Sequence, residues 1–321
     1  MRDHGGNIDE ARARFGGTGW IDLSTGINRV PYPLPEFPSH VWTDLPTRRT
    51  QSALMVAART AFATQAPGLA LAGAQAAIQM LPRIAVPGQA RVLAPTYNEH
   101  AACLRAAGWQ VEEVRSLDAL AGAELAVVVN PNNPDGRRTP RTNLRAIAGQ
   151  VGRLIVDESF AEATPDLSLA ADADEHLVVL RSFGKFWGLA GLRLGFVFGG
   201  ADVIAQLAEM AGPWPVSGAA LEVGRIALGD HPWRASTIAR LAGEAQKLDQ
   251  YAALAGWDLV GGTHLFRTYH APDAKRAQDF LGHARIWSRI FPYSRHWVRL
   301  GLPGNGDEWA RVAVTLGNAR G

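Results

Sequence analysis

The 321-residue sequence predicts an α/β protein, with a mostly parallel central sheet in a large domain and a small α+β domain after it. Two observations support this prediction. Between residues 90 and 200, short runs of Val, Ile and Leu alternate with segments of helical spacing, as βαβ units require. After the string GPWPVSG (212–218), a long helical region precedes several short strand-like runs. The length also agrees with about two domains.

The elements are expected in the following order. Residues 18–49 hold five prolines and are expected to be extended or looped. A helix is expected to start near Ser52, where apolar residues begin to recur at helical spacing. Continuous apolar runs are typical of parallel strands that are buried on both faces. Such runs predict strands at residues 90–95, 124–131, 152–158, 176–183 and 192–200, with helices between several of them, such as 99–107 and 142–150.

The C-terminal third predicts a helical region at 219–255, with a break at 229–233, and then short strands. From these changes in residue pattern along the chain we expect three parts. Residues 1–45 form an N-terminal part, and a family resemblance implies that it is an arm that contributes to the small domain and to the active site. Residues 46–215 form the large domain, and residues 216–321 form the small α+β domain.

Composition narrows the classes of function. The composition, with 47% hydrophobic residues and a net charge of only +2, is typical of a packed globular protein. It does not favour a protein that binds nucleic acid or a membrane surface through basic residues. The single cysteine, Cys103, excludes an intramolecular disulfide framework and favours a reducing compartment. No signal-peptide pattern or long apolar run occurs, so we expect a cytoplasmic protein. The histidines are scattered and predict no metal site.

The run SFGKFWGLAGLRLGF (182–196) places one lysine, Lys185, among glycine and aromatic residues. It is not a P-loop, because the flanking residues are not those that the motif needs. Burial in apolar surroundings would lower the pKa of a lysine and make its amine nucleophilic toward an aldehyde. A phosphorylated aldehyde cofactor would also need hydroxyl groups and cations, which Ser182 and Arg193 could supply. A loop lysine that reaches solvent explains Lys185 equally well at this point.

Further polar residues follow the expected strands. The string NPNNPDG (130–136), Asp157 and Tyr97 each come at or just after a strand end, where open α/β sheets bind ligands. Gly73 precedes a helix whose first N–H groups could hold an anion. Each feature also has an ordinary structural explanation: a turn, a helix N-cap, a packed tyrosine or a plain helix start.

The order of these features resembles the fold-type-I family of pyridoxal-phosphate (PLP) enzymes, over essentially the whole chain. The resemblance implies the aminotransferase fold type I and PLP as the cofactor. It implies two catalytic residues, Lys185 as the Schiff-base lysine and Asp157 as the carboxylate that keeps the ring nitrogen protonated. The other implied cofactor contacts are the backbone at Ala74 and Gln75, the stacking ring of Tyr97, Asn133 at the phenolic oxygen, and Ser182 and Arg193 at the phosphate.

Within that family, the chain is similar to the threonine-phosphate decarboxylases of cobalamin biosynthesis, with the histidinol-phosphate aminotransferases as near relatives. The strings HGGN (4–7), DLSTGIN (22–28) and GPWPVSG carry this similarity together with the lysine run. Two departures separate the chain from the aminotransferase pattern. Phe160 replaces a tyrosine that contacts the phenolic oxygen, and Leu45 replaces a tyrosine that reaches the cofactor phosphate of the neighbouring subunit.

The resemblance also implies the substrate contacts. Arg299 is the candidate carboxylate ligand of the family pattern and Arg289 a second anion contact, but the sequence leaves open which arginine binds carboxylate and which binds phosphate. A guanidinium suits both roles because two N–H groups can meet two oxygens. His4 is a candidate phosphate contact and Asn28 a further candidate. The structural alternatives are partly exposed strand arginines and a histidine in a disordered terminus.

The implied reaction is the decarboxylation of L-threonine O-3-phosphate to (R)-1-amino-2-propanol O-phosphate. The bond broken at Cα is the one perpendicular to the cofactor ring, so the anion contacts choose between loss of carbon dioxide and transamination. A histidinol-phosphate-type aminotransferase is the main alternative. A non-catalytic PLP-binding protein and an α/β binding protein without a cofactor are the others. The resemblance further implies a small phosphorylated amino acid as substrate and a homodimer.

Overall fold

The structure, a computed structural model, describes residues 4–319. It divides into two compact units. The larger unit comprises Tyr32–Asn133 and Arg137–Pro232, and the smaller unit comprises the remaining described residues. The expected boundaries at residues 45 and 215 therefore differ from the observed divisions. The larger unit continues to Pro232 because helix α9 (Gly218–Gly229) packs along helix α3 (Arg48–Ala61).

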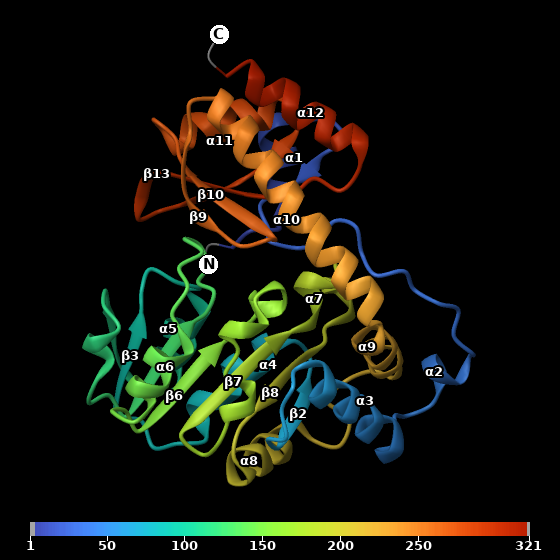
Figure 1. The fold of residues 1–321 in the computed structure, drawn as a ribbon, viewed down its shortest axis with the longest axis vertical. Coiled ribbons are helices and arrows are strands. Elements are labelled where there is room, and N and C mark those ends of the chain that lie inside the picture. Colours follow the sequence, from blue (N-terminus) through green and yellow to red (C-terminus); the bar gives the residue numbers. More distant parts are fainter. Residues whose placement is uncertain (1–3, 320–321) are drawn as a thin grey trace. The chain divides into compact units, whose positions relative to one another are not determined.

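The larger unit is built on a seven-stranded sheet with the strand order β2-β8-β7-β6-β5-β3-β4 (Figure 1). Its pairs are parallel, except that β8 runs antiparallel to both β2 and β7. The five predicted strands correspond to β3, β5, β6, β7 and β8. The strands are β2 (Gly68–Leu71), β3 (Gln89–Leu93), β4 (Gln110–Val114), β5 (Leu125–Val129), β6 (Arg153–Asp157), β7 (Leu177–Ser182) and β8 (Gly195–Phe198).

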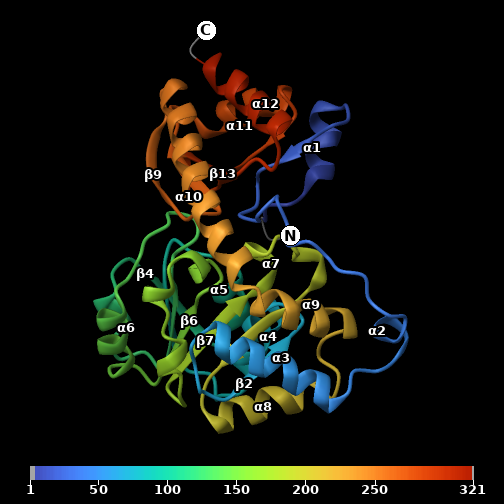
Figure 2. The same cartoon turned by 45° about the vertical axis from the view of Figure 1, so that its right-hand side comes forward.

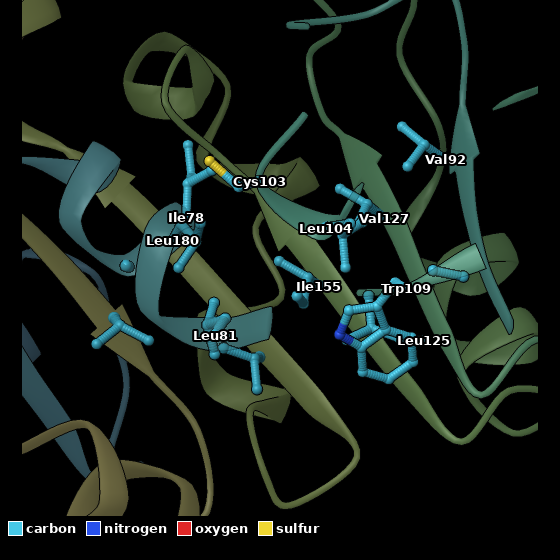
Figure 3. Packing of buried hydrophobic residues seen from close by; sticks show 14 of the residues in the cluster. Ile78, Leu81, Val92, Cys103, Leu104, Trp109, Leu125, Val127, Ile155 and Leu180 are labelled. Atoms are coloured by element: carbon cyan, nitrogen blue, oxygen red, sulfur yellow. The ribbon is translucent and has the colours of Figure 1, made fainter. Parts of the chain in front are cut away.

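Helices cover both faces of this sheet (Figures 1 and 2). Buried residues of α4, α5 and α8 share one core with alternate strand residues. Figure 3 shows Ile78 and Leu104 gathered around Ile155 and Leu180, with Trp109 beside Leu125. The helices besides α3 and α9 are α2 (His40–Thr43), α4 (Ala74–Met80), α5 (Glu99–Ala106), α6 (Arg141–Ala148), α7 (Phe183–Phe186) and α8 (Ala201–Ala211).

The proline-rich segment contains more regular structure than predicted. Short elements β1 (Ile21–Asp22) and α2 lie within it. Helix α3 begins at Arg48 and not near Ser52, because Thr47 and Thr50 form a capping box. The Thr47 hydroxyl accepts from the Thr50 N–H at 3.2 Å, and the Thr50 hydroxyl accepts from the Thr47 N–H at 3.1 Å. Two N–H groups at the helix start are thereby satisfied.

The smaller unit has an antiparallel sheet with the order β12-β13-β10-β9, and a parallel pair of β1 with β11 (Figure 2). It thus has the predicted α+β composition. Its other strands are β9 (Asp258–Gly262), β10 (Phe266–His270), β11 (Ile286–Trp287), β12 (Arg289–Phe291) and β13 (Ser294–Gly301), and its helices are α1 (Ile8–Phe15), α10 (His231–Leu254), α11 (Ala274–His283) and α12 (Gly306–Gly317).

Part of the string NPNNPDG belongs to the smaller unit, namely Pro134–Gly136. The Thr268 hydroxyl donates to the Pro134 carbonyl at 2.5 Å. A Cβ on Gly136, whose φ is +69°, would lie 2.2 Å from the Gly262 nitrogen, so a side chain cannot fit there. The turn is therefore held by the strands of the smaller unit, while the preceding Asn133 belongs to the larger one.

Among residues 4–319, no helix combines the length and the apolar character that crossing a bilayer requires.

Candidate active site

The larger unit has an open pocket at the carboxyl ends of its parallel strands. Strand order explains its position, because β3, β5, β6 and β7 all end at this edge and β8 starts there. Ligands bind at this edge in open α/β sheets. The pocket is lined by all the residues to which the sequence assigns cofactor contacts: Ala74, Gln75, Tyr97, Asn133, Asp157, Ser182, Lys185 and Arg193.

Asp157, the last residue of β6, is a buried carboxylate with two partners. Its Oδ2 lies 2.8 Å from His100 Nε2, and both side chains are 3% exposed. Its Oδ1 accepts from the Ser159 N–H at 2.9 Å and from the Ser159 hydroxyl. Burial would raise the pKa of Asp157, but the hydrogen bond and charge of His100, together with Ser159, hold it below its usual value. The pocket therefore contains an ionised, immobile carboxylate.

Lys185 lies on the short helix α7, which follows β7 directly. Close packing fixes this turn. A Cβ on Gly184 would lie 2.8 Å from the Ala190 Cα, and the rings of Phe183 and Trp187 stack at 4.4 Å between centroids. The Lys185 Nζ lies 5.7 Å from the centroid of the Phe160 ring. An amine thus lines the pocket beside the ring of Phe160.

Arg193 lies against the start of α4. Its backbone has the left-handed φ of 54°, unusual for a residue with a side chain, and its Nη1 donates to the Ala190 carbonyl at 3.1 Å. A Cβ on Gly73 would lie 2.7 Å from Arg193 Nη2, and one on Gly195 would lie 2.3 Å from the Ala74 nitrogen. The two glycines therefore allow a guanidinium and backbone N–H groups to gather at this end of the pocket, an arrangement that suits phosphate.

Tyr97 contributes an aromatic ring to the pocket wall. Its hydroxyl donates to Gln75 Oε1 at 3.1 Å. Burial, followed by the charges of Glu99 and Asp157, raises the pKa of Tyr97 to about 12. The phenol is therefore protonated at neutral pH. Its edge-on contact with the His100 ring has a centroid distance of 6.1 Å.

The side chains that line this pocket fit PLP. The amine of Lys185 matches the aldehyde, and the carboxylate of Asp157 matches the protonated ring nitrogen. The cation of Arg193, the Ser182 hydroxyl and the start of α4 match the phosphate. Tyr97 offers a flat face of the kind on which an aromatic ring stacks.

The smaller unit places two arginines side by side. Arg289 and Arg299 are direct partners across the β12–β13 pair, an arrangement of like charges that is unfavourable without an anion nearby. Arg299 is 6% exposed, and its guanidinium lies over the rings of Phe266 and Phe291, 5.2 and 5.9 Å from their centroids. Burial, followed by the charge of Arg289, lowers the pKa of Arg299 to about 10. The pair therefore suits a carboxylate or a phosphate.

The N-terminal strings HGGN and DLSTGIN pack together beside Arg299. Arg299 Nη2 donates to the Ser24 carbonyl at 2.6 Å, and the Ser24 hydroxyl accepts from the Gly6 N–H at 2.7 Å. A Cβ on Gly5 would lie 2.3 Å from the Ser24 carbonyl oxygen. This close approach explains the glycine at position 5. His4 is exposed and directly precedes the two glycines.

Asn28 is buried, and its side chain supports the smaller unit. Its Oδ1 accepts from Arg240 Nη2 at 2.8 Å and from the Val30 N–H at 3.1 Å. The sequence did not predict this structural role. A substrate contact of Asn28 stays a prediction.

Comparison with known proteins identifies the family of this chain. The sequence profile of aminotransferase class I and II matches residues 46–316. The chain belongs to this family. Its relatives include the threonine-phosphate decarboxylase of Sinorhizobium sp., 43% identical over 98% of this chain and 97% of the relative. The histidinol-phosphate aminotransferase of Serratia proteamaculans is 31% identical over 68% of this chain and 66% of its own.

Solved structures of this family show the same fold. The histidinol-phosphate aminotransferase from Sinorhizobium meliloti, in complex with pyridoxal-5'-phosphate, superposes with a TM-score of 0.81 at 17% identity, covering 97% of this chain and 93% of that one. The predicted fold class, the aminotransferase fold type I, is thereby confirmed.

Sequence reasoning missed several residues that support the aminotransferase-family site. His100 and Ser159 hold Asp157, and Glu99 holds Gln75. His100 stands in the string PTYNEH after Tyr97, but no sequence signal relates it to Asp157, which lies 57 residues further on. Ser159 lies two residues beyond Asp157 and could have been predicted from that spacing, because a carboxylate often accepts from the residue two positions on.

A buried ionic cluster supports the segment after Asp157. Arg181 Nη1 donates to Glu158 at 2.8 Å and Arg181 Nη2 donates to Glu162 at 2.6 Å. The Arg181 guanidinium also lies 4.3 Å from the centroid of Phe62. Within the described residues, no group of three or more His, Cys, Asp or Glu side chains forms a possible metal site.

Proposed function

We propose that this chain catalyses the PLP-dependent decarboxylation of L-threonine O-3-phosphate. The products are carbon dioxide and (R)-1-amino-2-propanol O-phosphate, and the reaction serves cobalamin biosynthesis. The observation that carries the proposal is the 43% identity, over 98% of the chain, to a threonine-phosphate decarboxylase. Phe160 and Leu45, which replace tyrosines of the aminotransferase pattern, agree with it.

The family resemblance implies the cofactor roles, and the gathering of these residues in one pocket supports them. When bound, PLP supplies an aldehyde for the substrate amine and a conjugated ring that accepts an electron pair. Lys185 would hold the aldehyde before the substrate arrives, and Lys185 or a water would afterwards return a proton to Cα. Asp157 keeps the ring nitrogen protonated, and Tyr97 supports one face of the ring. Asn133 contacts the phenolic oxygen.

The phosphate of the cofactor is assigned to Ser182, Arg193 and the backbone at Ala74 and Gln75. Arg193 contributes a fork of N–H donors, and the start of α4 contributes N–H groups without helical partners.

The substrate contacts are assigned to the smaller unit. Threonine phosphate carries a carboxylate and a phosphate, and the paired guanidiniums of Arg299 and Arg289 match these groups in charge and shape. His4 and Asn28 are the further candidates. By fixing the carboxylate, the arginines determine which bond to Cα is broken, and hence decarboxylation over transamination.

A side-by-side product assay tests the proposal. Purified enzyme with threonine phosphate should release carbon dioxide with no keto acid present, and histidinol phosphate should be a poor substrate. The Lys185→Ala variant serves as the control for background release. Strict dependence on 2-oxoglutarate, with glutamate formed, would establish an aminotransferase instead. A yellow protein that turns over neither substrate would be a PLP-binding protein without catalysis, and a colourless one would have no such cofactor.

We also propose a homodimer. The larger unit exposes large apolar side chains at Trp42, Leu45, Val56 and Trp214, which are 67%, 65%, 62% and 53% exposed. A second copy of the chain would cover such side chains where they form a contiguous patch. Light scattering should give twice the mass of one chain, 34.5 kDa. A mass of one chain at micromolar concentration would reject the dimer.

We propose a cytoplasmic location, which agrees with a single cysteine that is buried. Cell fractionation should recover the protein with the cytoplasmic markers, and recovery with membranes or with the secreted fraction would reject this proposal.

A further inference from the structure

Glu99 is a buried carboxylate to which the proposed chemistry assigns no role. It is the first residue of α5 and is 5% exposed. It does not line the pocket, but its Oε2 accepts from Gln75 Nε2 at 2.9 Å. The Cys103 Sγ lies 3.9 Å from the same oxygen. Burial of a carboxylate costs free energy, so a buried carboxylate beside a pocket residue indicates a function.

The contacts of Glu99 fix the direction of a short hydrogen-bond chain. The amide nitrogen of Gln75 donates to Glu99 Oε2, so it faces that carboxyl group. The amide oxygen of Gln75 then faces the Tyr97 hydroxyl, at 3.1 Å, and the hydroxyl donates to it.

This order has two consequences for Tyr97. Its hydroxyl proton points toward Gln75 and is not available to a ligand. Its ring is held at the hydroxyl end as well as at the backbone, which restricts the tilt of the aromatic face in the pocket. A preorganised face binds a planar ring with less loss of conformational entropy than a mobile one.

We propose that Glu99 is a positioning residue that acts through Gln75 to fix the hydroxyl direction and the ring orientation of Tyr97, and so strengthens PLP binding. The inference rests on the proposed function only in that Tyr97 faces PLP. Glu99 itself touches neither the cofactor nor the substrate in this scheme.

The Glu99→Gln variant tests the inference, because a glutamine at 99 can donate as well as accept and no longer fixes the direction of Gln75. We expect the dissociation constant of PLP, titrated into cofactor-free protein without substrate, to rise about 3- to 10-fold, as the net contribution of one hydrogen bond predicts. In a Tyr97→Phe background the same substitution should have no further effect, because Gln75 then has no Tyr97 hydroxyl to direct. Glu112→Gln, at a carboxylate whose side chain is 59% exposed, controls for the change of charge.

The possible outcomes are distinct. An equal loss of PLP affinity with and without the Tyr97 hydroxyl would overturn the inference, as would a lower melting temperature of the cofactor-free protein with unchanged PLP affinity. If Glu99→Gln does not fold, Gln75→Met breaks the same chain and should weaken PLP binding to a similar extent; unchanged affinity there would also overturn it. Failure of the wild-type protein to bind PLP would reject the proposed function itself.

Discussion

Replacement of His100 by phenylalanine would test how the site keeps Asp157 ionised. The ring size is nearly kept, but the hydrogen bond of His100 Nε2 with Asp157 Oδ2, 2.8 Å long, is removed. Both side chains are 3% exposed, so water cannot easily replace the lost donor. A hydrogen bond to a charged group contributes about 1.5–3 kcal/mol, and we expect the cofactor-free variant to lose about that much stability at pH 7.

The sign of the pH dependence follows from the direction of the pKa shift. The pKa of Asp157 lies below its usual value in the folded protein, so its stabilising contribution is present above the unfolded-state pKa and is lost as pH falls through the folded one. Without His100 the pKa of Asp157 rises, and protonation then relieves the buried charge. The difference between wild type and variant should therefore shrink as the pH is lowered from 7 toward the unfolded carboxyl value of about 4.

Urea unfolding of the cofactor-free proteins at pH 7 and pH 5 measures this difference. His176→Phe is a matched control, because His176 is exposed and lies in the same unit. It should change the stability by less than about 0.5 kcal/mol. If His100→Phe destabilises equally at both pH values, His100 acts only by packing and the electrostatic argument is wrong.

Three further variants test other parts of the site. Lys185→Ala should leave no cofactor attached after hydride reduction and denaturation, and should lower turnover by at least about 100-fold; attachment at another side chain, seen by mass spectrometry, would contradict the assignment. Arg299→Lys keeps the positive charge but loses the two parallel N–H donors of the guanidinium. It should lower kcat/KM for threonine phosphate by about 10- to 100-fold with PLP affinity unchanged. An unchanged kcat/KM would show that Arg299 does not bind the substrate carboxylate. Gly195→Ala places a Cβ 2.3 Å from the Ala74 nitrogen and should weaken PLP binding at least about 10-fold, measured by titration; normal affinity would show that the start of α4 does not hold the phosphate.

Much of the larger unit could be predicted because parallel strands buried on both faces leave continuous apolar runs in the sequence. Strand β5 is buried along its whole length, and β7 along nearly all of it. The edge strand β4 reads QVEEV and is mostly exposed, so it leaves no such run. Strand β2 reads GLAL and is fully buried at only two of its four residues, so it leaves no such run either. These two strands were therefore missed.

The pocket could be predicted for a related reason. Each proposed cofactor residue lies at the end of a strand or the start of a helix, and the sheet gathers those positions at one edge. His100 and Glu99 could not be predicted in the same way. Their partners are Asp157 and Gln75, which lie 57 and 24 residues away along the chain. Spacing shows nothing about such contacts.

The division of NPNNPDG between two units was also beyond sequence reasoning. The composition of the string predicts a turn. Its residues do not show that Pro134–Gly136 accepts a hydrogen bond from the Thr268 hydroxyl and lies against two glycines of β9. A glycine at 136 is required by that close approach, whereas the string alone suggests only turn propensity.

The buried cluster of Arg181 with Glu158 and Glu162 restricts how this enzyme can evolve. Removing one member leaves an uncompensated charge in the interior, which costs far more than exchanging all three for apolar side chains. Single mutations at these positions should therefore be selected against. Homologous sequences should retain or replace the three residues as one set.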